Sequence, residues 1–193
     1  MRYDTEHKAR TRERILDEAA SAIRAEGPLA VSVAGLMKKA GLTHGGFYAH
    51  FGSKDDLVAE AIGHMFGGPY ANFAKLTEGK PPAEALAAYV DFYLSPRHRD
   101  ARDRGCPLPS LSGEVARMTA PARARFAEGA DRLRSSMARL LEAMGREDAE
   151  TLAASAIAEM VGAIALARAT DDRARSDEVL AATRGAVRAR LGI

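Results

Sequence analysis

The chain has 193 residues, of which 47% are hydrophobic and 28% are charged, a composition that is ordinary for a globular protein and excludes intrinsic disorder. The formal net charge is only +2, so nucleic-acid binding must be argued from where the charges lie. The single cysteine, Cys106, excludes an internal disulfide and is typical of a reducing compartment. No apolar run approaches 18 residues and the first residues are polar, so we expect a cytoplasmic protein with neither signal peptide nor membrane span.

Abundant alanine, sparse β-branched residues and the absence of sustained alternation predict an all-α fold. The first expected helix spans 5–26 and ends at Gly27, because glycine suits the position after a helix and Pro28 cannot continue it. The apolar face of this helix consists of Ile15, Leu16, Ala19, Ala20 and Ile23.

Two short helices and a tight turn follow. Ser32 is a good N-cap for a helix that ends at Gly41, and Thr43 can cap a third helix over 44–51. Two such helices joined by the turn at 41–43 form a helix-turn-helix, whose second helix lies in the DNA major groove.

Ser53 can cap a fourth helix, with Asp56 three residues later completing a capping-box pattern. This helix should kink or break at 67–69, where Gly-Gly-Pro occurs. The charged stretch 95–109 should form a surface loop or a short helix. Further helices are expected over 83–94, 122–144, 148–170 and 177–191.

The run from 32 to 57, SVAGLMKKAGLTHGGFYAHFGSKDDL, closely resembles the DNA-binding signature of the TetR family. The Gly-Leu-Thr turn, the aromatic group at 47–51 and the Ser-Lys-x-x-Leu helix start all stand in family register. The resemblance covers roughly residues 8–68. One departure is Met37, where the family more often has alanine, and it concerns the packing of the two short helices.

The resemblance implies a DNA-binding domain over 1–68 and a ligand-binding and dimerisation domain over 69–193. It implies a homodimeric transcriptional regulator, in most members a repressor, that leaves a palindromic DNA operator when a small-molecule or electrophile effector acts on the C-terminal domain. An activating role stays open. No cofactor and no metal are expected.

Gly45 and Gly46 are poor helix formers, which close approach of the backbone to DNA explains better than tight packing on another helix. His44 is either a groove contact or an ordinary surface histidine. The resemblance implies that the Tyr48 hydroxyl contacts a DNA phosphate. Lys54 begins a helix, and a phosphate can bind at such a helix start. The predicted DNA-binding residues are Lys8, Arg10, Ser32, Lys38, Thr43, His44, Gly45, Gly46, Tyr48, His50 and Lys54.

Basic residues in the first helix support this interface. Lys8, Arg10, Arg12 and Arg14 would neutralise phosphates, a contribution that carries affinity without sequence information. Phe47 and Phe51 should pack inward.

The helix expected over 148–170 is apolar on more than one face, so it must be covered by its own core and by a second subunit. With the last helix it predicts the dimer interface. Aromatic side chains at helical spacing are candidates for an effector pocket, although plain core is the commoner role of such residues. The candidate ligand-binding residues are Phe66, Tyr70, Tyr89, Phe92, Tyr93, Cys106 and Phe126.

Cys106 follows Arg102 and Arg104, which should lower the pKa of its thiol and favour a reactive thiolate. Several relatives that respond to electrophiles or oxidants carry a Gly-Cys pair at a similar place. The alternative is a buried, inert thiol, which is what a free cysteine usually is.

Two other classes of function find less support in the sequence. An enzyme has no support, because the sequence lacks a phosphate-binding glycine loop, GxSxG and HExxH, and its histidines lack metal-ligand spacing. A helical interaction module that has lost DNA binding is disfavoured by Lys54, Tyr48 and the basic first helix.

Overall fold

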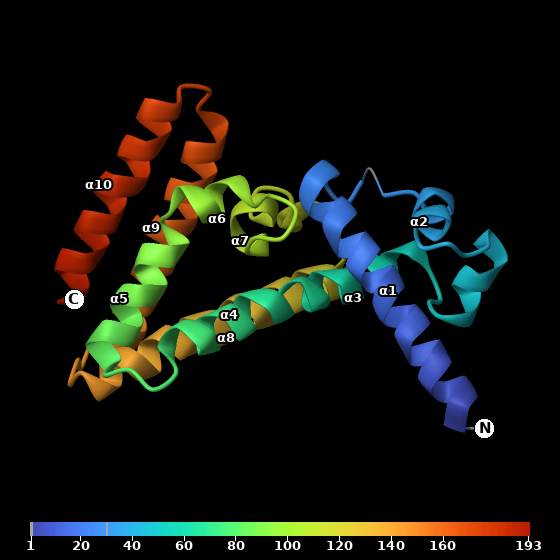
Figure 1. Cartoon of the computed structure of the whole chain (residues 1–193), viewed down its shortest axis with the longest axis horizontal. Coiled ribbons are helices and arrows are strands. Elements are labelled where there is room, and N and C mark those ends of the chain that lie inside the picture. The colour runs from blue at the N-terminus through green and yellow to red at the C-terminus, as the bar shows by residue number, and fades with distance from the viewer. Residues whose placement is uncertain (1, 30) are drawn as a thin grey trace.

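The computed structural model describes residues 2–29 and 31–193, with side chains from Glu6 onward, and within that part of the chain it contains helices and no strand. This confirms the all-α fold class. In Figure 1, helices α1, α2 and α3 gather at one end of the molecule. Helices α9 and α10 stand at the other end, and α8 spans the distance between the two ends, with α3 packed along it.

The N-terminal part contains α1 (Arg2–Glu26), α2 (Val33–Lys39), the 3-10 helix η1 (His44–Ala49) and α3 (Lys54–Met65). The third element is therefore a short 3-10 helix, tighter than the α-helix expected over 44–51. The core of this N-terminal part consists of Ile15, Ala19, Ile23, Leu36, Met37, Phe47, Phe51, Leu57 and Ile62.

Two of the three predicted helix caps form. The Ser32 hydroxyl accepts a hydrogen bond from the N–H of Gly35 at 3.1 Å, and the Ser53 hydroxyl accepts one from Asp56 N–H at 3.1 Å. Thr43 occupies the N-cap position of η1, but its side chain makes no capping bond, so that prediction is wrong.

The Gly67-Gly68-Pro69 sequence interrupts the long helix only briefly. Phe66 separates α3 from α4 (Gly67–Thr77), and Pro69 lies in the first turn of α4, where a missing N–H breaks no helical bond. The remaining elements are α5 (Pro82–Tyr93), α6 (Pro96–Asp100), α7 (Pro107–Leu111), η2 (Val115–Arg117), α8 (Ala120–Ala143), α9 (Ala149–Ala169) and α10 (Arg173–Leu191).

Helix α9 is long and apolar enough to cross a membrane, contrary to the expectation that no such segment exists. A core helix of a soluble protein passes the same test, and α9 packs against both α8 and α10. Its buried side includes Met160 and Ile164, which are 1% and 0% exposed. One such helix is therefore weak evidence for a membrane span.

The N-terminal helices are joined to the rest of the chain by close packing of α3 on α8. The ring of Phe66, at the end of α3, is 1% exposed and lies against Gly129 in the middle of α8. A Cβ atom at Gly129 would stand 2.3 Å from the Phe66 ring, far inside van der Waals contact. Only glycine fits at this position without a shift of the two helices.

Gly129→Ala should destabilise the fold by about 1–3 kcal/mol, because the extra methyl group forces the buried Phe66 ring or the α8 backbone to move. Urea unfolding at a fixed protein concentration measures this change. Gly63→Ala is the matched control, since its Cβ would meet only the flexible Arg125 side chain at 3.5 Å. Equal free energies of unfolding for the two variants would contradict the packing argument.

Candidate DNA interface and effector cavity

Helix η1 separates its aromatic residues into a buried and an exposed group. Phe47 and Phe51 are 1% and 3% exposed and stack with ring centroids 5.7 Å apart, as predicted. Tyr48 is 67% exposed, and its ring packs edge-on against Phe47 at 5.2 Å. His44 is exposed on the same short helix. The buried pair fixes the helix, and the exposed pair is free to contact a partner.

The two glycines of η1 are not required by packing within the chain. A Cβ at Gly45 would meet nothing within 4 Å, and one at Gly46 would make ordinary contacts, the nearest 3.5 Å from Thr43 Oγ1. Of the two explanations considered for these glycines, tight packing on another helix therefore loses its support. What remains is an exposed stretch of bare backbone, to which another molecule can approach closely.

Predicted phosphate contacts surround this exposed helix. Lys8, Arg10 and Lys38 are exposed on α1 and α2, and Ser32 and Thr43 are exposed at the adjacent helix starts.

Lys54 is half-buried at the start of α3, and its Nζ lies 3.5 Å from the carbonyl of Leu29, with no carboxylate partner among the described residues.

Arg12 differs from the other basic residues of α1. Its guanidinium forms an ion pair with Glu60 on α3 and lies 4.8 Å from the centroid of the Phe51 ring. It therefore stabilises the packing of α1 on α3, and it is not a free phosphate ligand as the charge pattern suggested.

His50 is half-buried behind η1. Burial, and then the charges of Lys8 and Arg12, lower the pKa of its imidazole, so the ring is neutral at physiological pH. Its Nδ1 atom is buried without a hydrogen-bond partner in the described chain. A neutral His50 can supply hydrogen-bonding capacity to DNA, but not positive charge.

The predicted effector residues do not form one site. Tyr89, Phe92, Tyr93 and Cys106 line a cavity of about 210 Å³ between α4, α5 and the segment before α7. The other three lie nearer α8. Phe66 and Tyr70 line a separate groove of about 340 Å³, and Phe126 contacts Phe66 at 6.0 Å without lining either space.

Cys106 is buried, with 4% of its surface exposed, and burial raises the pKa of its thiol. The expectation that Arg102 and Arg104 would lower this pKa is wrong. Arg104 is exposed and pairs with Asp103 at 3.3 Å, while Arg102 donates to the carbonyl of Arg168 at 2.8 Å. Arg104 lines the same cavity as Cys106, but the arginines that act on the thiol pKa are Arg168 and Arg24, which are distant in sequence.

His98 forms a wall of the cavity that the sequence did not reveal. Its Nδ1–H donates to the carbonyl of Tyr93 at 2.8 Å, and its Nε2 accepts the N–H of Cys106 at 3.2 Å. Burial lowers its pKa to about 4, which makes the ring neutral and allows this donor and acceptor pair. The imidazole therefore fixes the backbone at Cys106, while the buried hydroxyl of Tyr93 has no hydrogen-bond partner of good geometry among the described residues.

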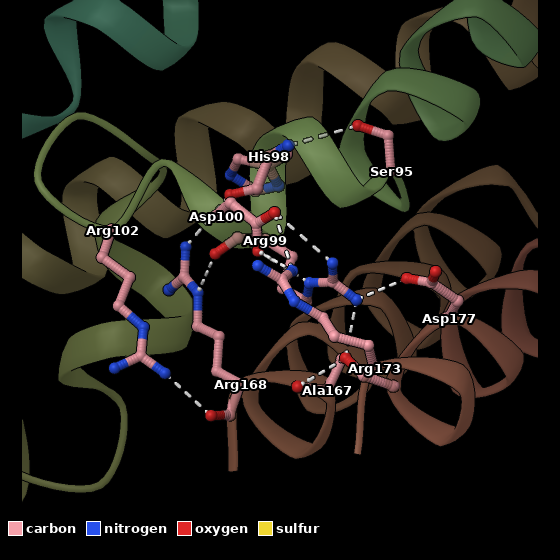
Figure 2. Close-up of polar contacts among 10 residues, drawn as sticks. Ser95, His98, Arg99, Asp100, Arg102, Ala167, Arg168, Arg173 and Asp177 are labelled. Atoms are coloured by element: carbon pink, nitrogen blue, oxygen red, sulfur yellow. Dashed lines mark hydrogen bonds and ion pairs between the residues drawn. The ribbon is translucent and has the colours of Figure 1, made fainter. Parts of the chain in front are cut away.

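The cavity wall is tied to α9 and α10 by a polar network (Figure 2). The buried Arg99 of α6 donates to Ser176 Oγ at 2.7 Å and to Asp177 Oδ1 at 2.5 Å, both on α10. From α9, Arg168 Nε donates to the carbonyl of Arg99 at 3.0 Å. Hydrogen bonds from Arg99 and then Arg173 lower the pKa of Asp100 to about 2, so its carboxylate stays charged at neutral pH. These contacts hold the segment beside Cys106 against the last two helices.

Comparison with known proteins agrees with this geometry along most of the chain. The model for bacterial regulatory proteins of the tetR family matches residues 15–61, and the one for the tetracycline repressor-like C-terminal domain matches residues 82–183. HTH-type transcriptional regulators from two Mycobacterium tuberculosis strains are each 30% identical over 169 residues, which is 83% of this chain and 86% of theirs.

Solved structures show the same fold. A TetR transcriptional regulator from Chloroflexus aurantiacus has a TM-score of 0.82 at 25% identity and covers 97% of this chain and 96% of its own. Reduced NemR from E. coli has a TM-score of 0.79 at 22% identity, with 92% and 94% covered.

The exposed helix-turn-helix and these matches define a DNA-binding transcriptional regulator, and not an enzyme. The chain belongs to the TetR family.

Because Cys106 is buried and its thiol pKa is raised, native protein should react with iodoacetamide at pH 7.5 at least about tenfold more slowly than the urea-unfolded chain. Mass spectrometry of timed samples measures both rates. Arg104→Gln should leave the native rate unchanged, since this arginine does not act on the thiol. A native rate as fast as the unfolded one would restore the reactive-thiolate hypothesis.

Proposed function

We propose that the protein is a cytoplasmic repressor that binds a palindromic operator as a homodimer and is released by a small-molecule effector. The observation that carries this proposal is the exposed helix η1, with His44 and Tyr48 outward, bare backbone at Gly45 and cations on both sides. We further propose that residues 1–68 form the DNA-binding domain and that residues 69–193 bind the effector and form the dimer.

On DNA, η1 would enter the major groove with His44 against a base edge. Lys8, Arg10 and Lys38 would contact phosphates on either side, and Lys54 would hold one at the start of α3. The proposed interface is completed by hydroxyl and imidazole groups that can donate hydrogen bonds to phosphate oxygens. These groups belong to Ser32, Thr43, Tyr48 and His50.

The proposed dimer interface is a mostly small and apolar face of α9 and α10, whose charged contact is the ion pair between Glu159 and Arg190. Between 154 and 169 every fully exposed residue of α9 is small or apolar, and Leu166 is 64% exposed. Small side chains let helices approach closely, and burying such a face against a second copy removes apolar surface from water. The exposed residues of this face are Ala154, Ser155, Ala158, Ala165, Leu166, Ala169, Ala181, Ala182, Gly185, Ala186 and Ala189.

The cavity at Cys106 is the proposed effector site. Its volume of about 210 Å³ suits a small, one-ring molecule, and its walls offer the aromatic side chains of Tyr89, Phe92 and Tyr93. A polar substituent on that ring would meet the Tyr93 hydroxyl, which is buried beside the Cys106 thiol. The raised thiol pKa favours noncovalent binding over electrophile capture. The Arg99 network supplies a physical path from this cavity to α9 and α10.

Lys54→Ala and Arg10→Ala should each weaken binding to every DNA sequence and flatten the plot of log affinity against log salt by about one unit. His44→Ala should instead relax discrimination at one base pair per half-site, at a cost of roughly 1–3 kcal/mol. Fluorescence anisotropy across a salt series, on palindromic DNA selected from a random library, measures both effects.

Lys75→Ala is the control for this series, because Lys75 is an exposed lysine on α4, outside the proposed interface. If Lys54→Ala changed the salt slope no more than Lys75→Ala, the phosphate contact assigned to Lys54 would be wrong.

Leu166→Glu should convert the dimer into monomers, because it replaces the most exposed large apolar side chain of this face with an unpaired charge. Operator binding should fall with it, since a single half-site binds weakly. Light scattering at micromolar concentration measures the mass. Leu29→Glu makes the same change at a leucine that is 91% exposed on another surface, and it should leave the dimer intact. A wild-type monomer, or dissociation by both substitutions alike, would refute this interface.

A further inference from the structure

A polar hollow of about 350 Å³ lies between α6, the end of α9 and the start of α10. It is distinct from the cavity at Cys106. Four guanidinium groups converge on this region from three different helices and the turn after α6, as Figure 2 shows. They belong to Arg99, Arg102, Arg168 and Arg173, and the lining carboxylates are those of Asp100 and Asp171.

Two of the four arginines have carboxylate partners. Arg99 pairs with Asp100 at 2.9 Å and with Asp177 at 2.5 Å, and Arg173 pairs with Asp100 at 2.9 Å. Arg102 and Arg168 have no carboxylate within ion-pair distance in the described part of the chain. The arginines around the hollow therefore carry more positive charge than its lining carboxylates neutralise.

The unpaired arginines donate only to backbone carbonyls. Arg168 donates through Nε to Arg99 O at 3.0 Å and through Nη2 to His98 O at 3.3 Å, and Arg102 donates through Nη2 to Arg168 O at 2.8 Å. These bonds cap the ends of α6 and α9, which explains the orientation of both side chains. A guanidinium has five N–H donors, so both keep donors free.

The remaining charge is not neutralised by this capping. Burial lowers the pKa of Arg168 most, and the nearby Tyr93, Cys106 and Asp100 raise it. The positive charge of Arg102 lowers it, because the two cations repel each other. An anion between them would remove that repulsion and use the free donors in charge-assisted hydrogen bonds.

We propose that this hollow binds a multiply charged oxyanion, either free or as the phosphate or carboxylate group of a small metabolite, through Arg102 and Arg168. Guanidinium forks match the geometry of such anions. The site lies apart from the proposed DNA surface, and it shares Arg99 and Arg168 with the network beside the cavity at Cys106. It can be tested without an operator or an effector.

Isothermal titration of the full-length protein with inorganic phosphate, at constant low ionic strength in chloride buffer, should show saturable binding of one phosphate per chain. Arg102→Gln should weaken that binding at least about tenfold, because it removes a charged fork from the site. Arg104→Gln is the matched control. It makes the same change two residues away on a side chain that is exposed and paired with Asp103, and it should leave the affinity within about twofold.

Asp171→Asn tests the same claim in the opposite direction. Asp171 is exposed, lines the hollow and makes no ion pair with a described residue, so its removal should tighten phosphate binding. A change that only disturbed the fold would not raise affinity, which keeps the test valid if Arg102→Gln proves unstable.

Citrate in place of phosphate distinguishes a carboxylate from a phosphate ligand. Binding of either anion that depends on Arg102 supports the proposal. Absence of binding by both anions, or equal weakening by Arg102→Gln and Arg104→Gln, overturns it.

Discussion

The packing of Phe66 into the space left by Gly129 determines how the two parts of this chain are related. Phe66 ends the helix that begins at Lys54, beside the proposed DNA surface, and Gly129 lies midway along α8. The Phe66 ring occupies the space that a side chain at position 129 would need, so α3 and α8 pack closely at this point. We expect a movement of α8 to be transmitted through this contact to α3, and with it to Lys54 and η1.

A second set of contacts acts at the opposite end. Arg99 is buried and fully engaged with α10, and His98 beside it holds the backbone at Cys106. The guanidinium of Arg99 is buried, while its carboxylate partners Asp100 and Asp177 are about half exposed, and these bonds tie α6 to α10. The cavity wall is thus connected to α9 and α10. Through this connection the proposed effector would act on the proposed subunit arrangement.

Local sequence patterns predicted the DNA-binding part well. The caps at Ser32 and Ser53 and the inward Phe47 and Phe51 depend on residues within a few positions of each other. The exposure of Tyr48 agrees with the family resemblance and was not predicted by a local pattern. The predicted side-chain cap at Thr43 and the predicted α-helix over 44–51 were wrong. The observed element is a 3-10 helix of six residues with two glycines. The predicted interruption at Gly67-Gly68-Pro69 occurs, and the chain resumes an α-helix directly at this sequence.

Local sequence patterns did not predict the contacts of the proposed effector region. The contact between Arg99 and Asp177 joins residues 78 positions apart, and no local pattern announces it. Burial of Cys106 depends on the packing of α4, α5 and α7, so the nearby arginines gave the wrong direction for its pKa. His98 was overlooked because a lone histidine in a charged stretch resembles a surface residue until its two buried partners are known.

In the proposed complex, two copies of this chain, joined through α9 and α10, present two η1 helices to one DNA site. Selection of bound sequences from a random DNA library by the purified protein, followed by sequencing, is the decisive measurement. We expect enrichment of a palindrome whose half-sites are centred about one helical turn apart, or a multiple of it. Enrichment of a single, non-repeated half-site, or of no sequence at all, would contradict it.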